Sequence, residues 1–268
     1  MNERVIHLGI LGNGNIGEAL VARIESQADT IATRTGIRLE ITRVAVRTME
    51  ELRSTHLADG VVTTDALSIC ADPDIDVIVE LVGGIEPAGS FVNAALAAHK
   101  PVVTANKALI AANGAELFDV AHAAEVDFLF EAAVGGGIPI IRPLRESLIG
   151  DRLTRVLGIV NGTTNYVLTR MTEEGLDFDD VLAEAQRLGF AEADPTADID
   201  GHDAAAKAAI LATIAFGMTV VAGDVHTEGI RQISADLIER ATRLGYVIKL
   251  LAIVERAPGP DGADQVAV

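Results

Sequence analysis

The chain has 268 residues, 21 of them basic and 39 acidic, and a formal net charge of −18. That charge disfavours binding to nucleic acid or to anionic membrane surfaces. Hydrophobic residues make up 49% of the sequence but aromatic residues only 3%, which predicts an aliphatic, alanine-rich core between helices and a sheet. The single cysteine, Cys70, excludes an internal disulfide and indicates a reducing compartment, and we expect it to be buried. Because no stretch approaches the ~20 apolar residues of a membrane span, the sequence predicts a soluble cytoplasmic protein.

The first motif is a glycine-rich hexamer. Residues 5–11 predict a buried strand, the hexamer G-x-G-x-x-G follows at once, and a long helical pattern comes next. Such glycines permit a tight turn, close approach of a pyrophosphate to backbone N–H groups, and packing of the helix on the strand. A turn that merely packs is the alternative, but the strand before and the helix after favour dinucleotide binding. The predicted cofactor-binding residues are Gly12, Asn13, Gly14, Asn15, Ile16 and Gly17.

A second predicted strand, residues 39–46, ends at Arg47. NAD-specific proteins usually place Asp or Glu at this point to bind the ribose hydroxyls, whereas an arginine accommodates a 2′-phosphate. Arg47 therefore favours NADP as the cofactor. A solvated loop charge is the alternative for Arg47, and Glu50 and Glu51 nearby keep NAD possible.

Strands and helices then alternate, with strands starting at Asp76, Pro101 and Asp127 and helices over 88–98 and 108–124. This alternation predicts a Rossmann-like, doubly wound parallel sheet of the α/β class, in which ligands bind beyond the carboxyl ends of the strands. Thr104 and Lys107 lie just past one such end and are predicted to bind cofactor. A lysine in the first turn of a helix opposes the helix dipole, so we favour a functional role for Lys107.

Beyond Gly150 the pattern changes, so we expect an NAD(P)-binding domain over residues 1–150 and a substrate domain over 151–268. A strand over 152–160, a turn and helix over 161–171, an amphipathic helix over 178–190, a helix over 235–244 and a strand over 246–257 predict an α+β domain. Between these elements lies the acidic segment 189–207, which leads into a helix that is apolar nearly all round and therefore buried.

Asp203 and Lys207 share one face of that helix because they are spaced i,i+4. Burial favours loss of a lysine's proton and a neighbouring carboxylate favours its retention, so the pair could hold an ammonium ready to donate a proton. In the alternative interpretation, Asp200 caps the helix and Asp203 is a first-turn acid, with no chemistry. The sequence has only four lysines, at positions 100, 107, 207 and 249, which suggests that each has a specific place.

Several motifs make the chain resemble the homoserine dehydrogenase family over nearly its whole length. They are GNGNIG (12–17), VVTANKAL (102–109), FEAAVGGGIPI (130–140), GIVNGTTNYVLTRM (158–171) and GFAEADPTADIDGHDAAAK (189–207), the last two being long and specific to that family. The resemblance implies reversible NAD(P)H-dependent reduction of L-aspartate 4-semialdehyde to L-homoserine, on the route to threonine, methionine and isoleucine. It also implies a homodimer for the full-length protein, formed through the sheet of the substrate domain.

The resemblance further implies roles for matching residues. Lys207 would donate the proton to the aldehyde oxygen, Asp203 would orient Lys207, and Lys107 would be a second catalytic lysine near cofactor and substrate. The implied substrate-binding residues are Glu192, which would hold the substrate ammonium, Asp198, Gly162 and Thr163. A structural sodium ion would be bound by Glu131, Val134, Gly136 and Ile138.

The last residues, DQVAV, read as the start of a strand after a GPDG turn at 259–262, whereas the family continues with further strands. We therefore expect a C-terminally truncated homoserine dehydrogenase, with a non-catalytic dinucleotide-binding fragment as the alternative. Another amino-acid oxidoreductase with a Rossmann half is disfavoured, because such enzymes lack the GFAEADP segment followed by D-x-x-x-K.

Overall fold

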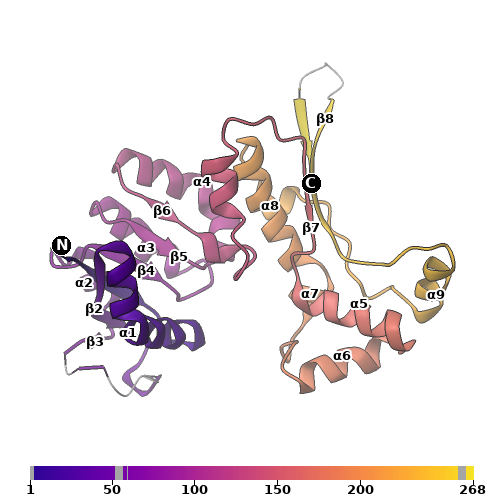
Figure 1. The fold of residues 1–268 in the computed structure, drawn as a ribbon, viewed down its shortest axis with the longest axis horizontal. Helices are drawn as coiled ribbons and strands as arrows, with labels where there is room; N and C mark the ends of the chain where they lie inside the picture. Colours follow the sequence, from indigo (N-terminus) through magenta and orange to yellow (C-terminus); the bar gives the residue numbers. More distant parts are fainter. Residues whose placement is uncertain (1–2, 52–56, 59, 259–263) are drawn as a thin grey trace. The chain divides into compact units, whose positions relative to one another are not determined.

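The computed structural model describes residues 3–51, 57–58, 60–258 and 264–268 (Figure 1). The chain divides into two compact units, Met1–Ile138 and Pro139–Val268, called the first and second unit below. This division lies earlier than the boundary expected at residue 150. The sequence pattern changes only near residue 150, just before the first strand of the second unit. The helical turn η3 (Pro143–Ser147) precedes that point but already contacts helix α8 (His202–Phe216) of the second unit.

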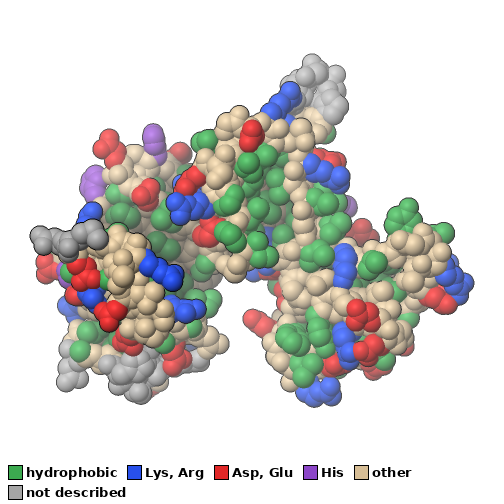
Figure 2. Space-filling model, viewed as in Figure 1, with side chains coloured by type: hydrophobic (Ala, Val, Ile, Leu, Met, Phe, Trp, Pro, Cys, Tyr) green, Lys and Arg blue, Asp and Glu red, His purple; other side chains and the backbone are tan. Residues whose placement is uncertain are grey.

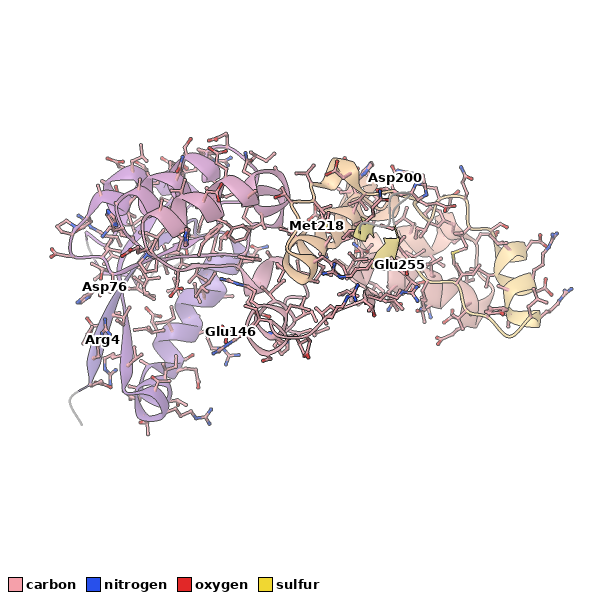
Figure 3. All side chains as sticks on the ribbon, turned by 90° about the horizontal axis from the view of Figure 1, so that it is seen from above. Arg4, Asp76, Glu146, Asp200, Met218 and Glu255 are labelled. Atoms are coloured by element: carbon pink, nitrogen blue, oxygen red, sulfur yellow. The ribbon has the colours of Figure 1, made fainter. Side chains whose placement is uncertain are left out.

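The first unit is built on a six-stranded sheet in the order β3-β2-β1-β4-β5-β6, with every neighbouring pair parallel. The strands are β1 (Arg4–Leu11), β2 (Ile37–Ala45), β3 (Val62–Thr63), β4 (Val77–Glu80), β5 (Val102–Thr104) and β6 (Phe128–Leu129). In Figure 3 the labelled Arg4 and Asp76 lie at the amino-terminal edge of this sheet. The order confirms the predicted doubly wound sheet, in which ligands bind at the opposite, carboxyl edge.

Helices connect the parallel strands of the first unit. They are α1 (Asn15–Thr35), α2 (Ala66–Ala71), α3 (Ala88–Ala97) and α4 (Lys107–Ala123), with single turns η1 (Met49–Glu51) and η2 (Glu131–Ala133). Neither β3 nor α2 was predicted from the sequence, because both are too short to show a hydrophobic period.

The core of the first unit is aliphatic, as its composition predicts. Ile10, Val21, Val44 and Val79 form a buried cluster between the sheet and its helices. Cys70 is buried, and that burial raises the pKa of its thiol to about 11, so it behaves as a small apolar residue. The few aromatic residues also gather, since the rings of Phe118, Phe128 and Phe130 lie 5.4–6.0 Å apart between α4 and β6.

The second unit has a three-stranded antiparallel sheet in the order β7-β8-β9. Its strands are β7 (Arg155–Gly158), β8 (Ala252–Pro258) and β9 (Asp264–Ala267), and its helices are α5 (Gly162–Glu174), α6 (Phe178–Arg187), α7 (Thr196–Ile199), α8, the turn η4 (Ala222–Asp224) and α9 (Ala235–Arg243). Figure 1 shows α5 and α6 side by side, and α8 beside β8. The α+β class is therefore confirmed.

The last two strands of the second unit can be compared with those expected from the sequence. The strand expected over 246–257 begins only at Ala252, because Lys249 is bonded to helix α5 through Asn165 Oδ1 and Thr169 Oγ1 and the segment before Ala252 runs along that helix. The strand expected at the end of the sequence is present as β9, while the GPDG turn before it lies outside the described residues.

Charged side chains are visible on the surface (Figure 2), and the apolar helix α8 is largely buried. Figure 2 shows acidic side chains on the visible face of each unit, with basic ones interspersed among them. Helix α8 is buried along most of its length, as predicted. In the part of the chain that the structure describes, no helix combines the length and apolarity that a membrane crossing needs.

Candidate active site

The glycine loop after β1 has the geometry of a dinucleotide-binding turn. Gly12 adopts φ +99°, and a Cβ there would lie 2.8 Å from the Leu81 backbone, while a Cβ on Gly17 would lie 2.3 Å from Gly12 O. Both positions therefore require glycine for packing. Gly14 differs, since no heavy atom outside its chain neighbours lies within 4 Å of the place a Cβ would take. The second glycine thus leaves the backbone open to a ligand.

Helix α1 presents its amino end at this loop. Gly14 is its N-cap, with no side-chain cap hydrogen bond, so the helix directs its partial positive charge to the carboxyl edge of the sheet. Ile16 is exposed beside it, and Asn13 is buried. Arg47 has an exposed side chain just beyond the end of β2, the strand that pairs with β1. The loop and the helix end therefore lie together at the carboxyl edge of the sheet, and Arg47 follows the neighbouring strand.

A buried polar network follows strands β4 and β5. Glu80 accepts hydrogen bonds from the backbone N–H groups of Val82 (2.7 Å) and Gly83 (3.1 Å) and from Thr104 Oγ1 (2.6 Å). Thr104 Oγ1 also accepts from Asn106 N–H at 2.9 Å. Thr104 was predicted to bind cofactor. Its hydroxyl is buried and makes both of these hydrogen bonds within the protein, so it holds the segment after β5 in place.

Asn106 continues this network to Lys107. Its Nδ2 donates to Gly84 O at 2.7 Å, and its Oδ1 accepts from Leu109 N–H at 3.1 Å, which caps α4. Lys107 is the first residue of that helix and is half-buried. Sequence reasoning missed Glu80 and Asn106, although an acid ending an otherwise apolar strand was a signal for Glu80.

The predicted sodium-binding residues lie in one short segment of the first unit. Glu131 begins the turn η2, Val134 is extended, and Gly136 follows with φ +43°. Ile138 N–H donates to Gly135 O at 2.7 Å, which closes the turn. Among the described residues, His, Cys, Asp and Glu form no group of three or more that could hold a metal. A cation here would therefore depend on Glu131 and backbone carbonyls, which suit a hard ion.

In the second unit, Lys207 and Asp203 form the predicted pair. Lys207 Nζ donates to Asp203 Oδ2 at 2.7 Å and to Val160 O at 2.6 Å, and the two side chains are 16% and 6% exposed. These acceptors engage two of the three ammonium hydrogens, and the described residues offer no further acceptor for the third. That hydrogen is available to an oxygen atom in the adjoining pocket.

The interpretation of Asp200 as the helix cap is wrong. Gly201, with φ +84°, is the N-cap of α8 and gives no side-chain bond. Asp200, labelled in Figure 3, instead pairs with Arg231, whose hydrogen bond holds the pKa of Asp200 below its usual value. Asp203 does lie in the first turn of α8, but its carboxylate is bonded to Lys207, so it is more than a dipole-stabilising acid.

Asn161, the N-cap of α5, joins the acidic residues of the site. Its Nδ2 donates to Asp198 Oδ1 at 2.6 Å and to Asp203 Oδ2 at 2.9 Å. One open pocket brings these groups together with Gly162 and Thr163. Its lining is Asn161, Gly162, Thr163, Asn165, Tyr166, Thr169, Arg170, Gly189, Phe190, Asp198, Asp203 and Lys207. Sequence reasoning missed Asn161, because its contacts lie far away along the chain.

Glu192 lies outside this lining. Its side chain is exposed, and its backbone carbonyl accepts from Gln186 Nε2 at 3.1 Å. Thr163 Oγ1, by contrast, donates to Phe190 O at 2.8 Å and so ties the start of α5 to the segment before Glu192. The structure therefore groups Asp198, Gly162 and Thr163 with the lysine pair, and places Glu192 in the adjacent exposed segment.

Two lining residues of the pocket, Tyr166 and Arg170, belong to a second polar cluster. Arg170 donates to both carboxylate oxygens of Glu184 at 3.0 Å, and the Tyr166 hydroxyl donates to the same carboxylate at 3.0 Å. These bonds, the one from Arg170 first, hold the pKa of Glu184 below its usual value, while burial and then Glu184 raise the pKa of Tyr166. The Tyr166 ring also lies 4.8 Å from Phe190. This cluster stiffens the pocket wall where α5 meets α6.

The parallel sheet and its glycine loop define a dinucleotide-binding Rossmann protein, joined to an α+β unit whose pocket contains a lysine–carboxylate pair. Comparison with known proteins narrows this class. Residues 12–131 match the family described as "Homoserine dehydrogenase, NAD binding domain", and residues 139–268 match the family described as "Homoserine dehydrogenase". The chain belongs to the homoserine dehydrogenase family.

Individual proteins that the chain resembles are also homoserine dehydrogenases. Homoserine dehydrogenase of Synechocystis is 50% identical over 256 residues, which cover 96% of this chain and 59% of that protein. The crystal structure of a homoserine dehydrogenase from Thiobacillus denitrificans matches with a TM-score of 0.89 and 47% identity, covering 95% of this chain and 59% of that one. A hyperthermophilic archaeal homoserine dehydrogenase, solved in complex with NADPH, matches with a TM-score of 0.76 and 28% identity over 98% of this chain and 81% of that one. The chain thus spans about three fifths of the length of the first two proteins.

Proposed function

We propose that the protein is a homoserine dehydrogenase, which interconverts L-homoserine and L-aspartate 4-semialdehyde with NADP(H), on the route to threonine, methionine and isoleucine. The observation that carries the proposal is the buried ion pair of Lys207 and Asp203, which opens into a pocket. Family membership of both units supports it.

The nicotinamide cofactor supplies the hydride when it is bound, so the chain must provide cofactor binding, substrate binding and one proton. In the reducing direction, Lys207 Nζ gives its third hydrogen to the aldehyde oxygen as the carbonyl carbon is reduced, and in the oxidising direction it takes that proton back. Asp203 and Val160 O fix the ammonium in place through the other two hydrogens. Asp203 also stabilises the positive charge on Lys207 before it reacts.

The substrate's amino-acid end needs complementary groups. We assign its ammonium to Asp198, in the pocket, and to Glu192, in the adjacent segment, while the Gly162 and Thr163 backbone at the start of α5 faces its carboxylate. The amino end of a helix attracts a carboxylate, and the first turn of α5 carries no acidic side chain. Binding at both ends of the substrate orients the reacting carbon.

The first unit supplies the cofactor site in this proposal. The loop from Gly12 to Gly17 and the amino end of α1 bind the pyrophosphate, and Arg47 accommodates a 2′-phosphate, which favours NADP over NAD. Lys107 lies at the start of α4, close to the nicotinamide end of such a cofactor. A sodium ion at Glu131, Val134, Gly136 and Ile138 would be structural. We also propose a cytoplasmic location and a homodimer for the whole protein.

A second candidate function is dinucleotide binding without catalysis. The observation that favours it is that the glycine loop lies in the first unit, whereas the Lys207–Asp203 pair lies in the second. It predicts NADPH binding without turnover of any hydroxy amino acid.

The test is oxidation of L-homoserine by the purified chain, followed by the appearance of NADPH or NADH, with L-serine and L-threonine as matched controls. We expect turnover with L-homoserine only and a lower KM for NADP⁺ than for NAD⁺. NADPH binding without turnover would favour the second candidate. A lower KM for NAD⁺ would contradict the assignment of Arg47.

A further inference from the structure

Asn161 is an uncharged residue of the proposed active site that contacts two of its carboxylates, those of Asp198 and Asp203. We propose, on the basis of the function proposed above, that Asn161 is a positioning residue: its side-chain amide holds the carboxylates of Asp198 and Asp203 together and thereby fixes Asp203 against Lys207.

Both amide hydrogens of Asn161 are bonded to carboxylates. Asn161 Nδ2 donates one to Asp198 Oδ1 at 2.6 Å and the other to Asp203 Oδ2 at 2.9 Å. Counted over whole residues, backbone included, Asn161 is 4% exposed and Asp203 7%. Two carboxylates this close repel each other unless a donor lies between them, and burial strengthens the repulsion. The amide of Asn161 is the donor that the structure places there.

The orientation of the amide is fixed from its other side. Asn161 Oδ1 accepts from the Thr164 backbone N–H at 2.8 Å and from Thr164 Oγ1 at 2.9 Å, which caps helix α5. Only the oxygen of the amide can face that N–H group, so Nδ2 must face the carboxylates. The side chain therefore uses all of its hydrogen-bonding capacity and cannot rotate without losing several bonds.

The amide is connected to Lys207 through Asp203. Asp203 Oδ2 accepts from both Asn161 Nδ2 and Lys207 Nζ, so one oxygen atom is fixed from two sides. The carbonyl of Val160, the residue before Asn161, is the other acceptor of Lys207 at 2.6 Å. The junction between β7 and α5 therefore sets the position of the ammonium through two adjacent residues.

Few charged groups face Asn161. Asp198 comes from α7, and Asp203 and Lys207 come from α8. Several other charged groups of the elements that pack against α5 or follow α7 are paired elsewhere. These pairs are Arg170 with Glu184 of α6, Asp200 with Arg231, Arg240 with Asp236 of α9, and Arg243 with Glu239 of α9. Glu173, Asp179, Asp180 and Arg187 are exposed, and Lys249 is bonded to Asn165 and Thr169. The charged groups bonded to Asn161, directly or through Asp203, are those of Asp198, Asp203 and Lys207.

The alternative is that Asn161 is only a helix cap. Asn161→Asp separates the two roles, because aspartate has the same shape and is an equally good cap acceptor, but it replaces the NH₂ group with a charged oxygen. If Asn161 is only a cap, the variant is at least as stable as wild type at neutral pH, and its added stability is lost as the pH falls and the carboxylate is protonated.

The positioning role predicts the opposite pH dependence. A third carboxylate between Asp198 and Asp203 favours its protonated form in the folded protein, so its pKa is raised above that of the unfolded chain. The stability of Asn161→Asp relative to wild type is then greatest at low pH, where the protonated carboxyl can again donate, and decreases as the pH rises above about 4, the pKa of aspartate in an unfolded chain, until the raised pKa is passed. The measurement is urea unfolding of wild type and variant across that range.

Ser234→Asp is the matched control, because Ser234 Oγ caps α9 by accepting from Leu237 N–H at 3.2 Å and bridges no carboxylates. It reports the pH dependence of a cap alone. If Asn161→Asp is unfolded at pH 7, refolding near pH 5 gives the same information. A stability of Asn161→Asp that rises with pH relative to wild type, as expected for Ser234→Asp, overturns the proposal.

Kinetics provide a second readout. Asn161→Ser keeps a cap oxygen but cannot reach both carboxylates, so we expect kcat/KM for L-homoserine to fall on the order of 10²-fold with the affinity for NADPH unchanged, because misplacement of a catalytic group costs about that much. Unchanged kcat/KM in a folded variant also overturns the proposal. If wild type does not oxidise L-homoserine, the proposed function fails, whereas the pH dependence of stability still decides the role of Asn161.

Discussion

Among the described residues of the first unit, Glu80 is the most deeply buried charged residue, with no exposed surface. Its two carboxylate oxygens accept three hydrogen bonds, from the Val82 and Gly83 N–H groups and from Thr104 Oγ1. All three donors are neutral, and both oxygens are needed as acceptors. Glu80 therefore fixes the loop after β4 and, through Thr104, the segment that leads to Lys107.

Replacement of Glu80 tests this account. In Glu80→Gln, the amide oxygen can still accept from the two N–H groups, but the NH₂ group then faces Thr104 Oγ1, and the buried Thr104 hydroxyl hydrogen loses its acceptor. We expect a loss of about 1–3 kcal/mol in the free energy of unfolding, the usual cost of unsatisfied buried groups. Urea denaturation measures it, and Glu86→Gln is the control, because Glu86 is exposed and its carboxylate accepts from the Ser90 hydroxyl, which is exposed as well. Equal stability of the two variants would contradict the role of Glu80.

At the scale of single residues, the sequence predicted Asp203 and Lys207 because their spacing along one helix is visible locally. Asn161 and Glu80 were missed for the opposite reason. Asn161 meets Asp203 across 42 residues and Glu80 meets Thr104 across 24. Only the folded chain brings these partners together, so no local pattern indicates the bond of Asn161 to Asp203, and the acid at the end of an apolar strand marks Glu80 without indicating its partner Thr104.

At the scale of elements, the glycine loop and helix α1 illustrate what a motif can predict. Strand, loop and helix were all expected from periodicity, and the structure adds the reason for each glycine. A Cβ at Gly12 or Gly17 would lie within 3 Å of backbone atoms, whereas Gly14 faces open space. The late start of β8 was not predictable, because the bonds of Lys249 to α5 override the β propensity of the segment.

Gly14→Ala separates packing from ligand binding. Gly14 has φ −73°, which alanine adopts without strain, and a methyl group there meets no protein atom within 4 Å. We expect an unfolding midpoint close to that of wild type but a dissociation constant for NADPH raised about 10-fold or more, because in the proposed site the methyl group would take space that the pyrophosphate needs. Isothermal titration calorimetry and thermal unfolding measure the two quantities. Unchanged affinity would place the cofactor elsewhere.

At the scale of the whole molecule, the net charge of −18 governs the response to salt. Repulsion among like charges destabilises a folded protein and is screened by any salt. We therefore expect the melting temperature to rise with both NaCl and KCl over about 0.05–0.5 M. A larger rise of the melting temperature with NaCl than with KCl would indicate a sodium site, because sodium binding to the folded state adds stability beyond charge screening.

Glu131→Gln is the control for that comparison, since it removes the one carboxylate of the proposed sodium site while changing the net charge by a single unit. The difference between the two salts should disappear in this variant. Identical curves for NaCl and KCl in the wild-type protein would contradict a sodium site in the segment from Glu131 to Ile138.

The proposed role of Lys207 as proton donor in L-homoserine oxidation and its reverse is tested most directly by comparing turnover of L-homoserine by the wild-type chain and by Lys207→Ala. We predict a loss of about 10²–10⁴-fold in kcat, the usual contribution of a general acid, with NADPH affinity retained. Arg240→Ala, in an exposed pair on α9, serves as the control for loss of a cation. Turnover by Lys207→Ala within a few-fold of wild type would contradict the account.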